Sequence, residues 1–120
     1  MNTQHVSAEL ANMALTPGVG ACALVDPVTG MVYLTAGDHP SIDSIAEAAS
    51  DYWRLYARGG TAFADLGPLQ AISMIHRDGV LSLMPCTEGI VMATLSGRMA
   101  LDMGAWFQKV ARLGQLIRQG

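Results

Sequence analysis

The first apolar pattern along the chain is helical. Residues 4–15 carry apolar side chains three or four positions apart, and the pattern stops at Thr16-Pro17-Gly18. Proline and glycine just beyond a periodic segment are typical of a helix end. The sequence therefore predicts a short amphipathic helix over residues 4–15. Its apolar positions are Val6, Leu10, Met13 and Ala14.

Two β-rich runs follow this helix. Residues 20–25 are apolar at every position after the glycine, and residues 31–35 contain Met-Val-Tyr-Leu-Thr. Between them, the segment from Asp26 to Gly30 combines a proline that fixes φ with a glycine that is free to take a positive φ. Two such runs around one short turn predict a β-hairpin.

A second helix is predicted from residue 42 to about Arg58, with Ser41 as its N-cap and Gly59-Gly60 beyond its end. Its apolar positions lie three or four residues apart and form one stripe. They are Ile42, Ile45, Ala49, Tyr52 and Tyr56. An acidic stripe lies one residue out of phase and consists of Asp43, Glu47 and Asp51.

The second half of the chain predicts a three-stranded meander. Residues 59–68 are expected to form a linking loop, Asp78-Gly79 is a hairpin signal, and residues 85–89 are expected to form a further turn. The strands are expected over residues 69–76, 80–84 and 90–95.

A last amphipathic helix is predicted over residues 98–118. Its apolar positions are Met99, Met103, Trp106, Val110, Leu113 and Ile117. The element order is then α-β-β-α-β-β-β-α, which we classify as an α+β fold with a five-stranded antiparallel sheet. Because the strands have few polar interior positions, water covers neither face of the sheet, and we expect helices on both faces.

Composition indicates one domain with a partly covered surface. The chain has 120 residues, enough for a single domain over residues 1–120, and 51% of them are hydrophobic, which excludes intrinsic disorder. Only 14% are charged, against roughly 25% in a typical soluble domain. A surface so poor in charge predicts that a partner covers part of it.

Charge, hydropathy and cysteine spacing exclude several functions. The seven basic residues are scattered over residues 54–120, which leaves no electrostatic footprint for nucleic acid. No apolar run approaches the roughly 18 residues of a membrane span, and residues 1–5 do not resemble a signal peptide. Cys22 and Cys86 have no metal-binding spacing, and we expect reduced thiols in the cytoplasm.

Side chains that carry catalytic chemistry do not converge in the sequence. There is no phosphate-binding glycine loop and no nucleophile elbow, and Cys86 beside Glu88 has no neighbouring histidine to activate it. His39, with Asp38 and Asp43 nearby, could hold a weakly bound metal, but a capping role before the second helix is favoured. We therefore expect no enzyme, with no catalytic residue, cofactor or metal.

Three aromatic residues of the second helix admit two interpretations. Trp53 lies at the side of the apolar stripe, between Tyr52 and Tyr56. It is either a large core residue or an interface anchor, because tryptophan and tyrosine are enriched in interfaces. The low charge content is consistent with a partner, and both interpretations stay open.

The strand phrase Gly-Val-Gly-Ala-Cys-Ala-Leu-Val-Asp-x-x-x-Gly over residues 18–30, in this element order, resembles the roadblock (dynein light chain) family. The likeness continues through residues 46–56, Gly79-Val80-Leu81, residues 89–93 and the terminal amphipathic helix. It covers nearly the whole chain, by pattern more than by rare residues. A profilin-like or longin-like sheet shares much of the same pattern.

The resemblance implies a layered fold and a mode of association. The middle helix covers one face of the sheet, and the first and last helices cover the other. Family members form dimers by joining edge strands into one sheet, with the middle helices side by side, and the free edge here is the strand over residues 69–77. The dimer-interface residues that we assign on this basis are Tyr52, Trp53, Tyr56, Gln70, Ile72, Ser73 and Ile75.

The resemblance also implies a function. Family members are scaffolds and regulators of Ras-like small GTPases, and they share no active-site motif. Our first hypothesis is a non-enzymatic homodimer that binds a small GTPase, with the acidic stripe as one candidate contact face. Arg54, Arg58 and Arg98 are candidates for an arginine finger by charge alone, and we do not favour that role.

Two alternatives differ in class. The first is a small-molecule sensor with a profilin-like or longin-like sheet, in which Ala21, Ala23 and Ala93 line a ligand cavity between the sheet and a helix. The second is a purely structural assembly subunit, which differs from the first hypothesis only in lacking a GTPase partner.

Overall fold

The computed structural model describes residues 1–98 and 100–119, and within them the helices and strands form in the predicted order. The helices are α1 (Thr3–Met13), α2 (Ile42–Ala57), the short 3₁₀ helix η1 (Gly60–Leu66) and α3 (Met103–Gln119). The strands are β1 (Val19–Val25), β2 (Val32–Gly37), β3 (Ile72–His76), β4 (Gly79–Thr87) and β5 (Ile90–Ser96).

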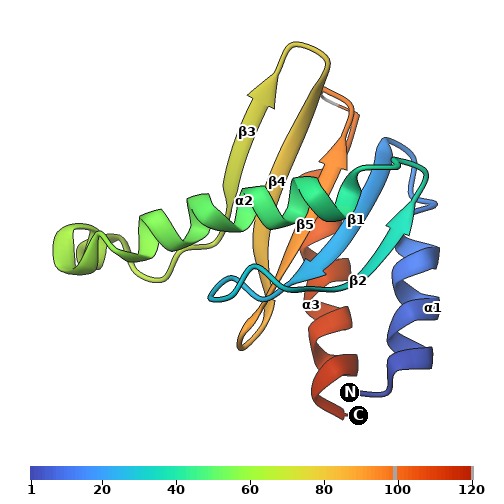
Figure 1. Ribbon diagram of the computed structural model, residues 1–120, viewed down its shortest axis with the longest axis horizontal. Coiled ribbons are helices and arrows are strands. Elements are labelled where there is room, and N and C mark those ends of the chain that lie inside the picture. Colours follow the sequence, from blue (N-terminus) through green and yellow to red (C-terminus); the bar gives the residue numbers. More distant parts are fainter. Residues whose placement is uncertain (99, 120) are drawn as a thin grey trace.

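The strands form one antiparallel sheet in the order β2-β1-β5-β4-β3. The hairpin β1-β2 and the meander β3-β4-β5 are joined by the pairing of β1 with β5 at the centre of the sheet. The strands β2 and β3 are therefore its two edges. α2 lies across one face of the sheet, and α1 and α3 lie side by side on the other (Figure 1). The predicted fold class and the predicted coverage of both faces are confirmed.

The layer between the sheet and the pair α1 and α3 holds the large side chains of the core. Trp106 is almost fully buried there, together with Leu24, Met84, Met92 and Leu113. The indole Nε1 of Trp106 donates to Oγ1 of Thr94 at 3.0 Å. This hydrogen bond satisfies both polar groups, which burial would otherwise make costly.

The layer between the sheet and α2 combines alanines with larger apolar residues. The sheet contributes three alanines and the helix contributes two, all of them at most 1% exposed. They are Ala21, Ala23, Ala93, Ala46 and Ala49. The larger buried residues of the same layer are Val25, Ile42, Leu81, Leu83 and Val91.

The buried face of α2 differs from the apolar stripe that the sequence predicts. Its buried residues are Ile42, Ala46, Ala49 and Ser50. Tyr52, predicted to belong to the stripe, is 54% exposed, whereas Trp53 packs against the core of this layer. The prediction is thus confirmed for Ile42 and Ala49 and wrong for Tyr52.

The start of α2 is held by a side chain other than the predicted one. Ser41 occupies the N-cap position, but its side chain makes no capping hydrogen bond. Instead, its backbone N–H donates to Nδ1 of His39 at 3.2 Å. This contact supports the favoured interpretation of His39 as a residue that serves the helix start.

Three boundaries in the second half of the chain differ from the sequence prediction. The predicted loop over residues 59–68 contains η1, which is too short to carry a periodic pattern. β3 begins at Ile72 rather than at Leu69. The predicted turn over residues 85–89 is wrong, because β4 continues through Pro85 to Thr87. Proline is tolerated there because β3 no longer pairs with β4 beyond Leu83, which leaves an open edge.

The last helix begins later than the predicted residue 98. The side chain of Asp102 accepts a hydrogen bond from the backbone N–H of Ala105 at 3.1 Å, which makes Asp102 the N-cap of α3. Met103 is therefore the first helical residue. Met99, predicted on the apolar face of this helix, lies outside the described residues.

α3 crosses β4 so closely at Gly114 that a side chain has no room. A Cβ atom built on Gly114 overlaps the carbonyl oxygen of Cys86 and lies 2.8 Å from its carbonyl carbon. The backbone of a central β4–β5 ladder cannot move aside cheaply. At Gly104 of the same helix, the nearest atom to such a Cβ is the Asp102 carboxylate oxygen at 3.5 Å.

We predict that Gly114→Ala lowers the free energy of unfolding by about 1–3 kcal/mol, the range typical of overpacked cores. The matched control, Gly104→Ala, is expected to be neutral or to stabilise by up to about 1 kcal/mol, because alanine is the better helix former. Urea unfolding of both variants measures the difference. Equal stabilities of the two variants would show that α3 can move away from β4.

Candidate interaction surface

The C-terminal half of α2 extends beyond the edge of its own sheet. α2 packs on β1, β2 and β5, and its far end carries η1 past the β3 edge (Figure 1). We call residues 52–66 the α2 overhang. Five of the eleven exposed large apolar side chains of the described residues lie in the overhang or on β3. They are Tyr52 (54% exposed), Leu55 (63%), Phe63 (41%), Leu66 (78%) and Ile75 (70%).

The overhang has internal structure of its own. The rings of Tyr56 and Phe63 stack with centroids 4.7 Å apart and an angle of 13° between their planes, which fixes η1 against the last turn of α2. A hollow of about 220 Å³ lies beside this stack and is also lined by Trp53 and Leu69. The apolar surface of the overhang therefore contains a hollow, and this hollow reaches Leu69 in the segment before β3.

The two edges of the sheet differ in how readily they accept another strand. At the β2 edge, Leu24 pairs with Leu34 and Val25 with Val32, so Tyr33 is an extra residue in a β-bulge. Bulges twist an edge strand away from further pairing. β3 pairs with β4 in unbroken register and contains no proline and no lysine or acidic residue. The β3 edge is thus the unprotected one.

The predicted interface residues fall in three places. Tyr52, Trp53 and Tyr56 lie in the overhang, where Trp53 is half-buried and packs against the core cluster of the α2 layer. Trp53 thus belongs to the core of the α2 layer and is still partly exposed. Ile72, Ser73 and Ile75 lie on β3, with Ser73 and Ile75 exposed. Gln70 is exposed and precedes β3.

The sequence prediction missed three exposed apolar residues of the overhang. Leu55 lies outside the apolar stripe that the helical pattern picks out, and Phe63 and Leu66 lie in a segment that was expected to be a loop. The sequence did contain a signal for Phe63 and Leu66. Two large apolar residues in a glycine-rich segment indicate that another surface covers them.

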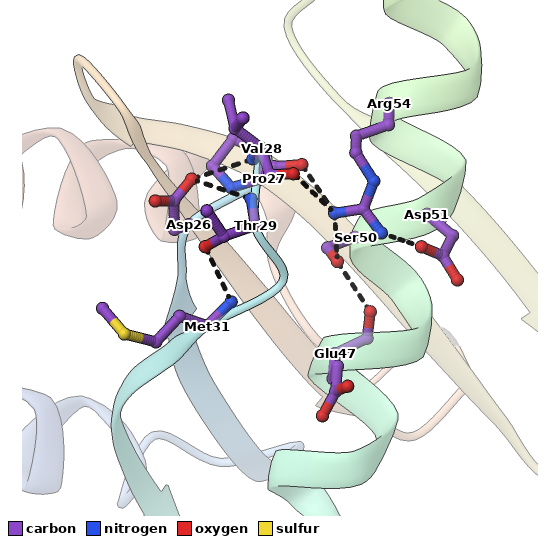
Figure 2. Close-up of polar contacts among 9 residues, drawn as sticks. All are labelled: Asp26, Pro27, Val28, Thr29, Met31, Glu47, Ser50, Asp51 and Arg54. Carbon is purple, nitrogen blue, oxygen red and sulfur yellow. Dashed lines mark hydrogen bonds and ion pairs between the residues drawn. The ribbon is translucent and has the colours of Figure 1, made fainter.

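On the opposite side of α2, Arg54 ties the helix to the turn between β1 and β2 (Figure 2). Its guanidinium Nη1 donates to the carbonyl oxygen of Pro27 at 2.8 Å, and the same group pairs with the carboxylate of Asp51. Nη1 also lies 3.2 Å from Oγ of Ser50, which in turn donates to the carbonyl oxygen of Glu47 at 2.6 Å. We call these contacts the Arg54 clamp.

The turn that Arg54 holds is itself fixed by Asp26. The side chain of Asp26 accepts from the backbone N–H of Val28 at 2.8 Å and of Thr29 at 3.4 Å, and from the Tyr33 hydroxyl at 3.4 Å. The hydrogen bond from Val28 lowers the pKa of the Asp26 carboxyl below its ordinary value of 3.8, with smaller contributions from Thr29 and Tyr33. Gly30 completes the turn with a φ of 79°.

The two thiols and Arg54, one of the three candidate arginines, are not available for catalysis in this structure. Burial raises the pKa of both Cys22 and Cys86 to about 12, so neither is a thiolate at neutral pH. Arg54 is engaged in the clamp and does not project as an arginine finger. His39 and His76 line one hollow of about 490 Å³ at the end of the sheet. Even so, no group of three metal-ligating side chains exists among the described residues.

The cavity that a small-molecule sensor requires is not formed by the residues expected to line it. Ala21, Ala23 and Ala93 are fully buried and pack directly under α2. They fill the layer between helix and sheet, so the structure gives this alternative no support. Within residues 1–98 and 100–119, no helix is both long and apolar enough to cross a lipid bilayer.

The structure is a three-layer α-β-α domain with a five-stranded antiparallel sheet. Solved structures with the same architecture exist. The roadblock/LC7 domain from Streptomyces avermitilis is similar over 96% of this chain and 93% of its own, with a TM-score of 0.77 and 24% identity. The chain therefore has the roadblock/LC7 fold, as its resemblance to that family implies.

Two structures of MglB share this fold. Myxococcus xanthus MglB is similar over 99% of this chain and 96% of its own, with a TM-score of 0.73 and 12% identity. A structure described as MglB with tetrameric arrangement is similar over 97% of this chain and 87% of its own, with a TM-score of 0.71 and 17% identity. No protein-family model and no curated protein matches the sequence.

The lowered pKa of Asp26 predicts how pH changes the stability of the turn. The folded state prefers the carboxylate, so the stability that Asp26 contributes is present above pH 3.8 and is lost as the pH falls through the lower folded-state pKa. The melting temperature of Asp26→Asn is therefore expected to lie below that of the wild type at neutral pH, with the gap closing below pH 3.8.

Asp38→Asn, in the exposed loop before α2, is the control for a general charge effect. Thermal unfolding of the three proteins across the acidic range is the measurement. A gap between wild type and Asp26→Asn that stays constant with pH would mean that the carboxylate charge does not stabilise the turn.

Proposed function

We propose that residues 1–120 form one domain that acts as a non-enzymatic homodimeric scaffold or regulator and binds a Ras-like small GTPase in the cytoplasm. The observation that carries the proposal is the apolar α2 overhang beside an unprotected β3 edge. The first feature needs a partner that buries it, and the second supplies the backbone groups that orient that partner.

A second copy of this chain meets both needs at once. In a twofold dimer, β3 pairs antiparallel with β3 of the other copy, and the two sheets become one. Each overhang then extends past its own edge strand and lies against the other copy, which buries apolar surface that is exposed in the single chain. We assign to this interface Tyr52, Trp53, Tyr56, Gln70, Ile72, Ser73 and Ile75, and add Leu55, Phe63 and Leu66.

The small-GTPase partner follows from the resemblance to the roadblock family, whose members regulate such GTPases. Two MglB structures have the same fold as this chain, and one of them is described as tetrameric, which supports self-association. The candidate contact face is the acidic stripe. Asp43 and Glu47 are exposed and free to meet a basic partner surface, whereas Asp51 is paired with Arg54.

For the dimer, we predict that light scattering during size exclusion gives twice the mass of one chain, and that Tyr52→Asp gives a monomer. Placing a carboxylate in a dry interface costs several kcal/mol, and each 1.4 kcal/mol is about a tenfold change in the dissociation constant. Tyr52 is half-exposed in the single chain, so the substitution leaves its core intact.

Leu15→Asp is the matched control, because Leu15 is 80% exposed and lies between α1 and β1, away from the overhang. It is expected to remain a dimer. Ile75→Lys tests β3 separately and is expected to weaken the dimer. A monomeric wild type would remove the proposed dimer, and a Tyr52→Asp dimer as tight as the wild type would move the interface away from α2.

For the GTPase, we predict that the purified dimer binds a Ras-like GTPase encoded in the same genome and changes its rate of GTP hydrolysis. If the acidic stripe is the contact face, Asp43→Lys with Glu47→Lys weakens binding at least about tenfold at low salt and less at high salt. Glu9→Lys on α1 is the control. A dimer that binds no such GTPase supports the structural assembly subunit instead.

A further inference from the structure

α2 is held to the sheet by apolar contacts. Ala46 and Ala49 of the helix pack with alanines of the sheet, Ile42 is buried in the same cluster, and Trp53 packs against it. Apolar burial favours contact but is not directional. Hydrogen bonds from the helix to another element add direction to this contact.

The Arg54 clamp supplies directional bonds in the part of α2 that leaves the sheet. Arg54 lies within the part of α2 that leaves the sheet, between Trp53 and Leu55 and two residues from Tyr52. Its side chain is 28% exposed, and its guanidinium reaches the carbonyl oxygens of Pro27 and Val28, 27 and 26 positions away along the chain. Bonds from a charged donor are roughly twice as strong as neutral ones.

The other end of the clamp is rigid. Asp26 closes the β1–β2 turn with its own hydrogen bonds, and Pro27 has a fixed φ. The turn also rests directly on α2, because a Cβ at Gly30 would lie 3.4 Å from Ser50 Oγ and 3.5 Å from Glu47 Cγ. Figure 2 shows the Arg54 guanidinium between this turn and the helix. The clamp therefore ties α2 to a fixed point of the sheet.

We propose that Arg54 is the positioning residue of the self-association surface: by fixing α2 to the β1–β2 turn it sets the pose of the overhang relative to the β3 edge. This inference rests on the proposed homodimer. A twofold interface needs the overhang and the edge strand in one fixed relation, because both must meet their counterparts on the other copy at the same time.

The test compares Arg54→Met with Arg54→Lys and with Arg58→Met. Methionine keeps the apolar stem but removes every donor, and lysine keeps the charge but loses the planar fork. Arg58 lies one turn further along the chain, and its side chain makes no hydrogen bond or ion pair with the described residues. We expect Arg54→Met to raise the dimer dissociation constant at least about tenfold and Arg58→Met to leave it unchanged. The dissociation constant of Arg54→Lys is expected to lie between those of the wild type and Arg54→Met.

A pose measurement separates positioning from a loss of stability. Nitroxide labels on Asp65→Cys in η1 and Glu88→Cys in the β4–β5 turn report the distance between overhang and sheet. The native cysteines are buried and stay unlabelled. With labelled protein diluted into a large excess of unlabelled protein, we expect one narrow distance distribution for the wild type and for Arg58→Met, and a broad one for Arg54→Met.

Each outcome decides between the two proposals. A monomeric wild type overturns the proposed homodimer, whereas the label distances still report whether the clamp fixes the overhang. A dimeric wild type with a narrow distribution in Arg54→Met overturns the positioning role. A broad distribution with an unchanged dissociation constant overturns it as well, because the pose would then not govern association.

Discussion

The structure depends on one constraint: a five-stranded sheet that is apolar on both faces must be covered on both faces. Two helices, α1 and α3, cover one face with the largest core residues, Trp106 among them. α2 alone must cover the other, and it packs on β1, β2 and β5. One helix is too narrow for five strands, so the region beside β3 is left uncovered, and this is where we place the proposed partner. Five of the eleven exposed large apolar side chains of the described residues lie in this region.

Small residues lie at the helix–sheet contacts on both faces. On one face Gly114 lets α3 cross β4 at the carbonyl of Cys86, and on the other five alanines lie between α2 and the sheet. The half-buried Arg54 adds hydrogen bonds from α2 to the β1–β2 turn. In our proposal, these directional bonds set the pose of the α2 overhang.

The element order and both helical layers could be predicted because periodicity reports which faces are apolar. The pattern could not tell which of two adjacent residues, Tyr52 or Trp53, faces the sheet, since that depends on how close α2 lies. The pattern also predicted a turn at Pro85, where β4 continues. Only the pairing of the strands shows that β4 has an open edge there, which tolerates a proline. The sequence placed aromatic residues of α2 in the candidate interface, and this assignment stays a prediction. Leu55, Phe63 and Leu66 were missed because their exposure is decided by where the sheet ends.

Several polar groups of the molecule serve its own structure. Asp26 fixes a turn, Arg54 joins that turn to a helix, and the two thiols are buried with pKa values of about 12. What the chain presents to other molecules is an open strand edge, an apolar overhang and an acidic helix face. Such features are suited to recognising shape, backbone and charge on another protein. They agree with the proposed role of a scaffold or regulator that brings partners together in a fixed geometry.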